Sequence, residues 1–460
     1  MTQPLQAADF RAHRRHILSS TATAFAGLVA SGCGAGVGSS TSAIAPTVTT
    51  ADGAARSPRL SAPLVPDPNG VLDLQEGFSY RVLSRRGDVM DDGLSVPDSA
   101  DGMGCFALKG DIALVRNHEL SPGQDAGGAL PSGYAHDADG AVLPGGTTTL
   151  VLDAQTLAVK RQFRSLGGTV RNCSGGITPW GTWLTCEEPG SRMNRLPDHG
   201  FVFEVPASAT SMVDPRPIKA MGRFNHEAAC VDPATGIVYM SEDKDDGLLY
   251  RYQPNVPGDL AQGGRLQALA LTSGIRDSRN WNSAEVERGV AHTAHWIDLD
   301  NPEAPDDDLR KRGAAAGALV IARGEGLHMG VNDRASELYL CSTSGGAARL
   351  GQIFRLRPGI AGAADTFELF FESESEEQLN FGDNLTVAPF GDLIVCEDQY
   401  TDVVNNRLIG ITPAGEPYVF GALRIQTELA GGCFSPDGKW FFVNAYSPST
   451  TFAITGPWTT

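Results

Sequence analysis

Hydrophobic and polar positions alternate in short runs along most of the chain, and one arrangement recurs from about residue 95 onward. A polar residue opens a short apolar strand, a turn follows, and a second apolar strand ends in acidic or polar residues. The segment EAACVDPATGIVYMSED, which begins at Glu227, is one copy. Short alternating runs separated by D-x-x-G or P-x-G turns predict paired β-strands. The copies begin at Asp101, Cys173, Glu227, Glu325, Asp383 and Glu428.

Six such units predict an all-β fold, a six-bladed β-propeller that spans residues 67–460. A propeller fits many short strands joined by tight turns better than a sandwich does. The long connection between Arg251 and Ala318 predicts an insertion between strands, with a helix over SAEVERGVA, residues 283–291.

Propeller geometry turns this repeat into a candidate site at the axis of one face. The first strand of each blade lines the central channel, and the second returns to the same face, so residues that open and close the pair meet there. The opening positions are Cys173, Glu227, Glu325, Asp383 with Asn384, and Glu428. The closing positions are Glu119, Glu187 with Glu188, Glu242 with Asp243, Glu397 with Asp398, and Asn444.

So many carboxylates on one face repel one another and need cations or raised pKa values to coexist. Oxygen ligands suit Ca²⁺, Mg²⁺ or Mn²⁺, and carboxylates with one thiolate can also hold iron. The predicted metal ligands are Glu119, Cys173, Glu187, Glu227, Glu242, Asp243, Glu325, Asp383, Asn384, Glu397 and Asp398.

The N-terminal part of the chain is predicted to direct export. Arg14 and Arg15 precede a mildly apolar stretch over 21–30, which is too short to cross a membrane, so residues 1–33 are typical of a twin-arginine export signal. Cys33 ends a segment similar to a lipoprotein cleavage box, which leaves lipidation of Cys33 and ordinary signal cleavage as alternatives. Residues 34–66 are rich in Gly, Ser, Thr, Ala and Pro and predict a flexible linker. The expected location is periplasmic, extracellular or tethered to a membrane.

Composition narrows the function classes. The chain has 36 Lys+Arg against 54 Asp+Glu, a net charge of −18, which argues against nucleic-acid binding. Its 54 Gly and 28 Pro argue against a helical bundle. No CxxC indicates a zinc ribbon, and no G-x-S-x-G indicates a serine hydrolase, so a hydrolytic nucleophile would have to come from a metal site.

Several motifs, taken in order, strongly resemble the PhoX family of twin-arginine-exported bacterial alkaline phosphatases. They include RNHE (116–119), NCSGGITPWGTWLTCEE (172–188), RFNHEA (223–228), RGEG (323–326), DNLTVAPFGDLIVCED (383–398) and FSPDGKWFFVN (434–444). The resemblance covers residues 67–460, nearly the whole mature chain. The chain is shorter than the well-studied members and looks like a compact branch of the family.

The resemblance implies a phosphatase that hydrolyses phosphomonoesters at alkaline pH through a metal-activated oxygen nucleophile, with an iron–calcium cluster at the propeller axis. It implies that Cys173 supplies a bridging thiolate and that Arg323 contacts phosphate. Carboxylate ligands carried over by the family motifs are Glu119, Glu227, Glu325, Glu397 and Asp398. The expected partner is a small phosphorylated substrate bound by a monomer, with membrane contact only through an anchor at Cys33.

Two other functions remain open at this point. One is a non-catalytic envelope propeller that binds a partner or ligand and holds structural calcium. The other is a calcium lactonase-like hydrolase. Ligation by oxygen alone favours the lactonase, a thiolate at Cys173 favours iron, and Arg323 favours an anionic substrate.

Overall fold

The computed structural model describes residues 62–189, 199–332, 335–360, 362–399 and 403–458. Contacts divide the chain into two units, Met1–Ala54 and Ala55–Thr460. The predicted signal (1–33) and all but the last residues of the predicted linker (34–66) lie outside the described residues. Everything below concerns the second unit. Within the described ranges, no helix is both long and apolar enough to span a membrane.

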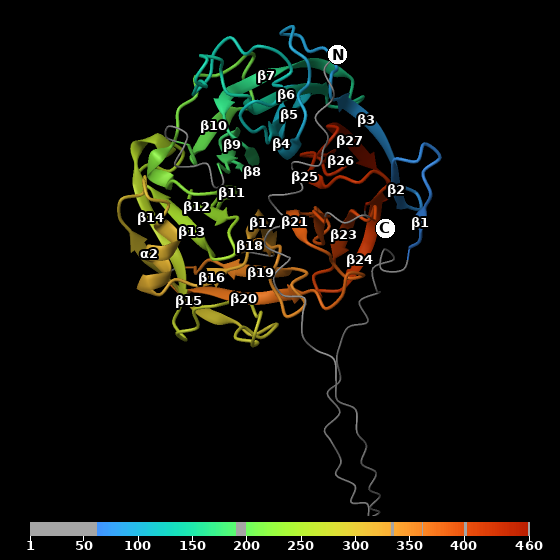
Figure 1. The fold of residues 1–460 in the computed structure, drawn as a ribbon. Coiled ribbons are helices and arrows are strands. Elements are labelled where there is room, and N and C mark those ends of the chain that lie inside the picture. Colours follow the sequence, from blue (N-terminus) through green and yellow to red (C-terminus); the bar gives the residue numbers. More distant parts are fainter. Residues whose placement is uncertain (1–61, 190–198, 333–334, 361, 400–402, 459–460) are drawn as a thin grey trace, which may run out of the picture. The chain divides into compact units, whose positions relative to one another are not determined.

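Hydrogen bonds join the described strands into five antiparallel sheets (Figure 1). The first sheet contains β4 (Ala100–Leu108), β5 (Asp111–His118), β6 (Gly145–Asp153) and β7 (Val159–Thr169). The second contains β8 (Asn172–Ile177), β9 (Thr182–Glu187) and β10 (Val202–Pro206). The third is the largest and contains β11 (His226–Val231), β12 (Val238–Glu242), β13 (Gly247–Pro254), β14 (Gly264–Leu271), β15 (His292–Leu299), β16 (Val320–Ile321), β17 (Gly324–Asn332), β18 (Ala335–Ser342), β19 (Gln352–Arg357) and β20 (Asp365–Glu372).

The fourth sheet contains β21 (Gly382–Val387), β22 (Leu393–Glu397), β23 (Arg407–Ile411), β24 (Pro417–Leu423), β2 (Leu72–Gln75) and β1 (Leu64–Val65). The fifth contains β25 (Leu429–Phe434), β26 (Phe441–Ala445), β27 (Thr450–Thr455) and β3 (Ser79–Arg85). The N-terminal strands therefore complete sheets built from the C-terminal part of the chain. β3 pairs along β27, and β2 pairs along β24, which ties the first described residues to the last.

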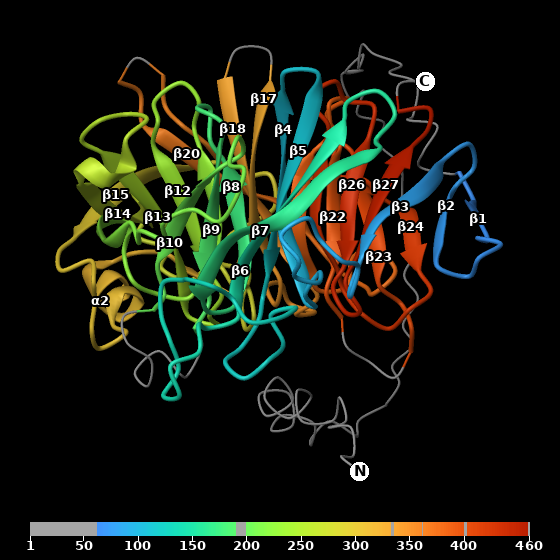
Figure 2. The same ribbon diagram turned by 90° about the horizontal axis from the view of Figure 1, so that it is seen from above.

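The first strand of each repeat lies at the centre of the unit. β4, β8, β11, β17, β21 and β25 each contact the next, and β25 returns to β4, so they form a closed ring (Figure 1). In Figure 2, which is turned by 90°, three of these strands, β4, β8 and β17, are seen along their length. Buried apolar side chains fill the spaces between neighbouring sheets, as in the cluster that joins Leu184 of β9 to Met240 of β12.

The fold is thus all-β and propeller-like, as the sequence predicted. The sheets do not separate into six blades, however, because β15 pairs with β20 and joins two of the predicted repeats into one sheet (His292↔Phe367). The hydrogen-bonding pattern therefore confirms the class of fold and not the number of blades.

The prediction of a helix over 283–291 is wrong. Asn280 holds this segment in a loop, because its side chain accepts from the Val286 amide (3.2 Å) and donates to the Val286 carbonyl (2.9 Å). These side-chain bonds replace the backbone bonds of a helical turn. The α-helix of the insertion is instead α2 (Leu309–Ala316), which packs outside β13 and β15 (Figure 2). Two 3₁₀ turns, η3 (Lys219–Met221) and η4 (Leu260–Gln262), complete the described helical structure.

Candidate metal centre

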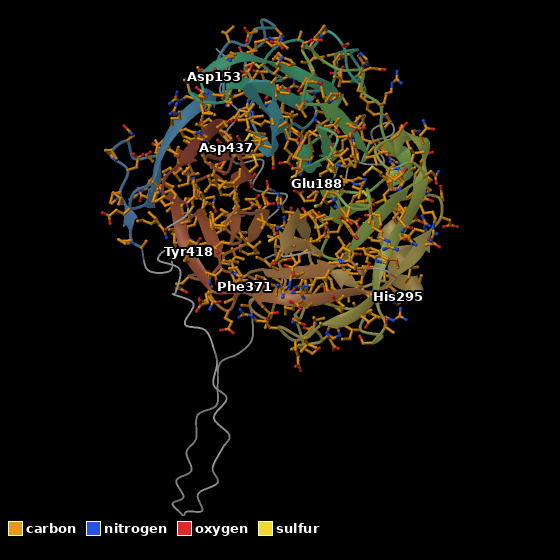
Figure 3. All side chains as sticks on the ribbon, turned by 180° about the vertical axis from the view of Figure 1, so that it is seen from behind. Asp153, Glu188, His295, Phe371, Tyr418 and Asp437 are labelled. Atoms are coloured by element: carbon orange, nitrogen blue, oxygen red, sulfur yellow. The ribbon has the colours of Figure 1, made fainter. Side chains whose placement is uncertain are left out.

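Nine buried side chains of the kinds that can bind a metal ion form four overlapping groups among the described residues. The groups are Asp101–Glu119–Cys173, Cys173–Glu188–Glu227, Glu227–Glu325–Asp383 and Asp383–Asp398–Glu428. Within each group the ligand atoms lie within 4.8 Å of one another. Cys173, Glu227 and Asp383 each belong to two groups, so the four groups form one continuous cluster. Figure 3 shows Glu188 near the centre of the ring of strands, whereas Asp153 and His295 lie at its periphery.

A β-bulge in each inner strand helps to position these ligands. The register shifts between Ala100 and Met103 in β4, and β8, β11, β17, β21 and β25 shift at the corresponding point. Five residues of the cluster lie within these bulges: Asp101, Cys173, Glu227, Glu325 and Asp383. A bulge re-aims a side chain that regular alternation would direct elsewhere. The repeated bulge therefore explains why residues from five separate strands converge.

The two members of each closing acidic pair lie in different environments. The first member is the last residue of its strand and binds protein groups away from the cluster, whereas the second follows the strand and faces the centre. Glu187 accepts from Gly200 N (2.8 Å) and contacts His199 Nδ1 (2.6 Å), while Glu188 belongs to the cluster. Because successive side chains along a strand point to opposite sides, one register decides which member can be a ligand.

The same division separates the other pairs. Glu397 forms an ion pair with Arg407 (2.6 Å), and Asp398 belongs to the cluster. Glu242 accepts from Tyr250 Oη (2.7 Å) and lies 3.5 Å from Arg310. The predicted ligands Glu187, Glu242 and Glu397 are therefore placed in structural contacts outside the four groups.

Two further predicted ligands lie beside the cluster without joining a group. Asp243 pairs with Arg323 (Oδ1 to Nε, 2.7 Å). Asn384 donates to Asp383 Oδ1 (2.9 Å) and accepts from Gly431 N (2.5 Å), so its amide orients a ligand. Of the predicted set, the structure brings together Glu119, Cys173, Glu227, Glu325, Asp383 and Asp398.

Three members of the cluster were absent from the predicted ligand set: Asp101, Glu188 and Glu428. Asp101 opens the first of the six repeats, and Glu188 is the second member of an acidic pair whose first member, Glu187, is the predicted ligand. Glu428 takes a different position from the other openers. The register shift in β25 begins after Ala430, so Glu428 lies two residues before the start of the bulge, whereas Arg171 and Arg323 lie one residue before the start of theirs. Its carbonyl accepts from Tyr446 N (3.1 Å), as that of Arg171 accepts from Glu188 N (2.9 Å).

Arg171 and Arg323 supply positive charge at the cluster. Arg171 Nη2 contacts Glu119 Oε1 (2.5 Å) and also pairs with Glu188. Arg323 bridges Asp243 and Glu325, with Nη2 2.6 Å from Glu325 Oε1. Both residues have a left-handed backbone, with φ of 46° and 49°. Such a conformation is uncommon for side chains other than glycine and persists where surrounding contacts impose it.

Burial disfavours the charged forms of the carboxyl groups and the thiol in the cluster when no cation is bound. It raises the pKa of Glu227, and the charges of Glu325 and Asp383 raise it further. Burial also raises the pKa values of Asp101 and Glu325, and that of the Cys173 thiol, whose Sγ lies 3.6 Å from Asp101 Oδ2. Bound cations would reverse this trend, because a coordinating thiol or carboxyl is held deprotonated.

One direct observation indicates that the side chains of the cluster suit metal ions. Both carboxylate oxygens of Glu227 are fully buried and receive no hydrogen bond from any described residue. Buried polar atoms are normally satisfied, and an unsatisfied pair calls for an unseen partner. A divalent or trivalent cation satisfies carboxylate oxygens and balances their charge at once.

Beyond the cluster, the inner strands enclose a cavity of about 380 Å³. Its lining includes Met103, Cys105, Trp183, Leu327 and Leu385, and it contains none of the nine cluster residues. The polar chemistry is therefore confined to one stretch of the inner strands, and the channel continues as a mainly apolar space.

The Glu187–Glu188 pair provides a direct test of which carboxylate is a ligand. We expect Glu188→Gln to lose bound metal, because the amide removes a negative donor shared with Cys173 and Glu227. Glu187→Gln should keep its metal and lose roughly 1–3 kcal/mol of stability, because its carboxylate satisfies buried backbone donors. Elemental analysis and thermal unfolding of both variants measure the two effects. Equal metal loss in both would contradict the assignment.

Metal removal should also change how stability depends on pH. Carboxyls with raised native pKa values bind more protons in the folded than in the unfolded protein, so stability falls as pH rises above their ordinary values. We expect the metal-free protein to melt at least about 5 °C higher at pH 6 than at pH 8.5. The metal-loaded protein should not show this gain on acidification. Calorimetry with and without chelator measures both, and a stripped protein equally stable at both pH values would contradict the prediction.

The fold is all-β and propeller-like, and it holds a buried cluster of carboxylates and one thiol. These features make the chain a candidate for the class of metal-dependent propeller enzymes. The model of the family described as alkaline phosphatase PhoX matches residues 60–156 and 144–449. The chain therefore belongs to the PhoX alkaline phosphatase family and is a phosphatase.

Among solved structures, PhoX from Pseudomonas fluorescens in complex with vanadate, a transition-state analogue, is similar in fold. The TM-score is 0.66 at 19% identity, and the match covers 86% of this chain and 97% of that chain. A luciferin-regenerating enzyme (TM-score 0.42, 11% identity, 83% and 96% covered) and a gluconolactonase from Xanthomonas campestris (TM-score 0.34, 14% identity, 86% and 97% covered) are more distant. A search of curated protein sequences found no match.

Proposed function

We propose that this chain is an exported, metal-dependent phosphatase that hydrolyses phosphomonoesters at alkaline pH, with its metal centre at the axis of a six-bladed propeller. The observation that carries the proposal is the nine-residue cluster, with the unsatisfied carboxylate of Glu227 inside it. Membership of the PhoX family favours this function over a non-catalytic propeller or a lactonase-like hydrolase.

The count of six blades rests on the inner strands. Six of them surround the channel, and each begins a run of antiparallel strands directed outward. The ten-stranded sheet then consists of two blades, β11–β15 and β17–β20, joined at their outer edges by the three residue pairs between β15 and β20. The prediction of 67–460 as one domain follows from this count.

The proposed metals are iron and calcium. Cys173 is the one thiol in the cluster and belongs to two of its groups, which favours iron there, because thiolates prefer softer ions than Ca²⁺. Glu227, Glu325, Asp383, Asp398 and Glu428 offer carboxylate oxygen, the donor that Ca²⁺ prefers. When bound, such ions activate an oxygen nucleophile and stabilise charge on phosphoryl oxygens.

The remaining polar residues would position substrate and ligands. Arg323 is the proposed phosphate-binding residue, since its side chain is 22% exposed and lies beside Glu325. Its guanidinium can exchange a carboxylate contact for a bidentate contact with phosphate. Arg171 directly precedes β8 as Arg323 directly precedes β17, and it keeps Glu119 and Glu188 in place. Tyr446 donates to Glu119 Oε2 (2.7 Å), and Asn225 donates to Glu188 Oε1 (2.8 Å).

The direct test is to purify the exported protein, measure its metals, and follow p-nitrophenyl phosphate hydrolysis as a function of pH. The proposal expects iron, calcium and alkaline turnover. Fully metal-loaded protein without turnover on any phosphomonoester would contradict it. The proposal of a monomer is checked in the same preparation by light scattering.

The export proposal rests on the N-terminal sequence, which lies outside the described residues. We expect replacement of Arg14 and Arg15 by lysine to retain the protein in the cytoplasm, because the export machinery recognises the paired guanidiniums. Cell fractionation measures the outcome, and unchanged export contradicts the proposal. Cys33→Ala, examined separately for release from membranes, distinguishes a lipid anchor from ordinary cleavage.

A further inference from the structure

Two arginines and a tryptophan form a stack beside Arg323 that the proposed phosphate chemistry does not use. The Arg279 guanidinium carbon lies 4.4 Å from the centre of the Trp281 ring, and that of Arg349 lies 4.3 Å from it. We call Arg279, Trp281 and Arg349 the arginine–tryptophan stack. Cation–π contacts of this geometry hold a guanidinium in place without consuming its hydrogen-bond donors.

The stack is fixed to the two loops that flank Arg323. Trp281 Nε1 donates to the Ser344 carbonyl (2.7 Å), and Arg279 Nη1 donates to the Asp245 carbonyl (3.2 Å). Residues next to these anchors bond the Arg323 backbone itself. Arg323 N donates to Lys244 O (2.8 Å), and Thr343 N donates to Arg323 O (3.0 Å). The insertion between β14 and β15 therefore brings Arg279 and Trp281 to the edge of the cluster, where Arg349 of the loop between β18 and β19 completes the stack.

The two arginines differ in how their charge is balanced. Arg279 is paired with Asp277 through two contacts, Nε to Oδ1 (2.8 Å) and Nη2 to Oδ2 (2.6 Å). Arg349 is exposed, and its guanidinium makes no ion pair with any residue in the described ranges. Its φ is 57°, another left-handed backbone outside glycine. A chain of net charge −18 thus presents an unbalanced guanidinium beside its proposed phosphate-binding arginine.

We propose that Arg349, supported by Trp281 and Arg279, binds a second anionic group on the substrate, so that phosphomonoesters bearing another phosphate are preferred. The inference rests on the proposed function, because it assumes that Arg323 binds the phosphoryl group that is cleaved. An exposed guanidinium presents donors in a planar fork that matches phosphate. It also offsets the repulsion that a doubly anionic substrate meets at an acidic site.

The test compares fructose 6-phosphate with fructose 1,6-bisphosphate in the metal-loaded full-length enzyme. We expect wild type to have the lower KM for the bisphosphate, and Arg349→Ala to raise the bisphosphate-to-monophosphate KM ratio about tenfold, the equivalent of about 1.4 kcal/mol. Arg349→Lys should restore part of the ratio. Arg216→Ala removes another exposed arginine, which forms an ion pair with Asp214, and should change neither KM. Thermal unfolding and calcium content of each variant confirm that fold and metals are retained.

The outcomes separate this inference from the proposed function. If wild type does not hydrolyse p-nitrophenyl phosphate, the proposed function fails. If it does, and the KM ratio is the same in wild type and Arg349→Ala, the second subsite is overturned while the phosphatase assignment stands. An equal effect of Arg216→Ala would assign the change to general surface charge and would also overturn the subsite.

Discussion

Replacing Cys173 with serine should abolish most of the phosphatase activity and remove the iron from the purified protein. The thiol belongs to two of the four ligand groups, between Asp101 and Glu119 on one side and Glu188 and Glu227 on the other. A serine hydroxyl keeps the volume but is a far poorer ligand for iron than a thiolate. We expect turnover to fall at least about 10³-fold, because the ion that activates the nucleophile is lost. Calcium should be retained in part, since the carboxylate groups around Asp383 do not include the thiol.

Cys230→Ser is the matched control for this prediction. Cys230 also lies on an inner strand, lines the apolar cavity, and belongs to none of the four groups. It should keep iron, colour and turnover, with at most a modest loss of stability. Colourless, iron-free wild-type protein with full activity would contradict the iron assignment, and retention of iron in Cys173→Ser would contradict the role of the thiol.

Repeated polar openings predicted the ring of inner strands well. Cys173, Glu227, Glu325 and Asp383 were recognised because each interrupts an apolar pattern at the same point of the repeat, and the structure brings all four into one cluster. Their convergence depends on the β-bulges, and no residue type in the sequence predicts where a bulge occurs. The sequence could therefore indicate that these positions share a face without showing that a local register shift turns them inward.

The closing pairs show where prediction from the sequence reached its limit. In Glu187-Glu188 and Glu397-Asp398 both residues are acidic, and only strand register distinguishes the residue that joins the cluster from the residue that binds protein groups outside it. The partners of the outward members, His199 and Arg407, were not linked to them by any spacing. A change of one position in strand register would exchange the environments of the two acidic residues. Residue types alone therefore do not determine which of the two faces the cluster.

The count of blades was obscured by a different interaction. The sequence repeat treats β11–β15 and β17–β20 as separate units, but β15 extends far enough to pair with β20. The loop that leads into β15 contains residues 283–291, for which the sequence predicts a helix. Asn280 holds that segment in a loop through side-chain bonds to Val286, six residues further on, and helix propensity alone does not include such bonds.

Arg323→Ala should lower kcat/KM for p-nitrophenyl phosphate by about 10²-fold or more while leaving the metals in place. The guanidinium lies between Asp243 and Glu325 at the edge of the cluster, and is not itself a ligand. A donor that meets the phosphoryl oxygens as charge develops commonly contributes about 3–4 kcal/mol to the transition state. Loss of that contact should lower kcat as well as raise KM. Arg323→Lys should recover only part of the activity, because an ammonium keeps the charge and loses the planar fork.

Arg357→Ala separates this effect from the loss of an ion-paired arginine as such. Arg357 also contacts two carboxylates, Glu337 and Glu368, but it does so on β19, away from the cluster. It should keep wild-type kcat/KM with a small loss of stability. A structural role for Arg323 predicts instead that its alanine variant loses metal and thermal stability together with activity. Wild-type turnover in Arg323→Ala would remove it from phosphate binding, and a loss of calcium or iron in that variant would make it a residue that positions Glu325.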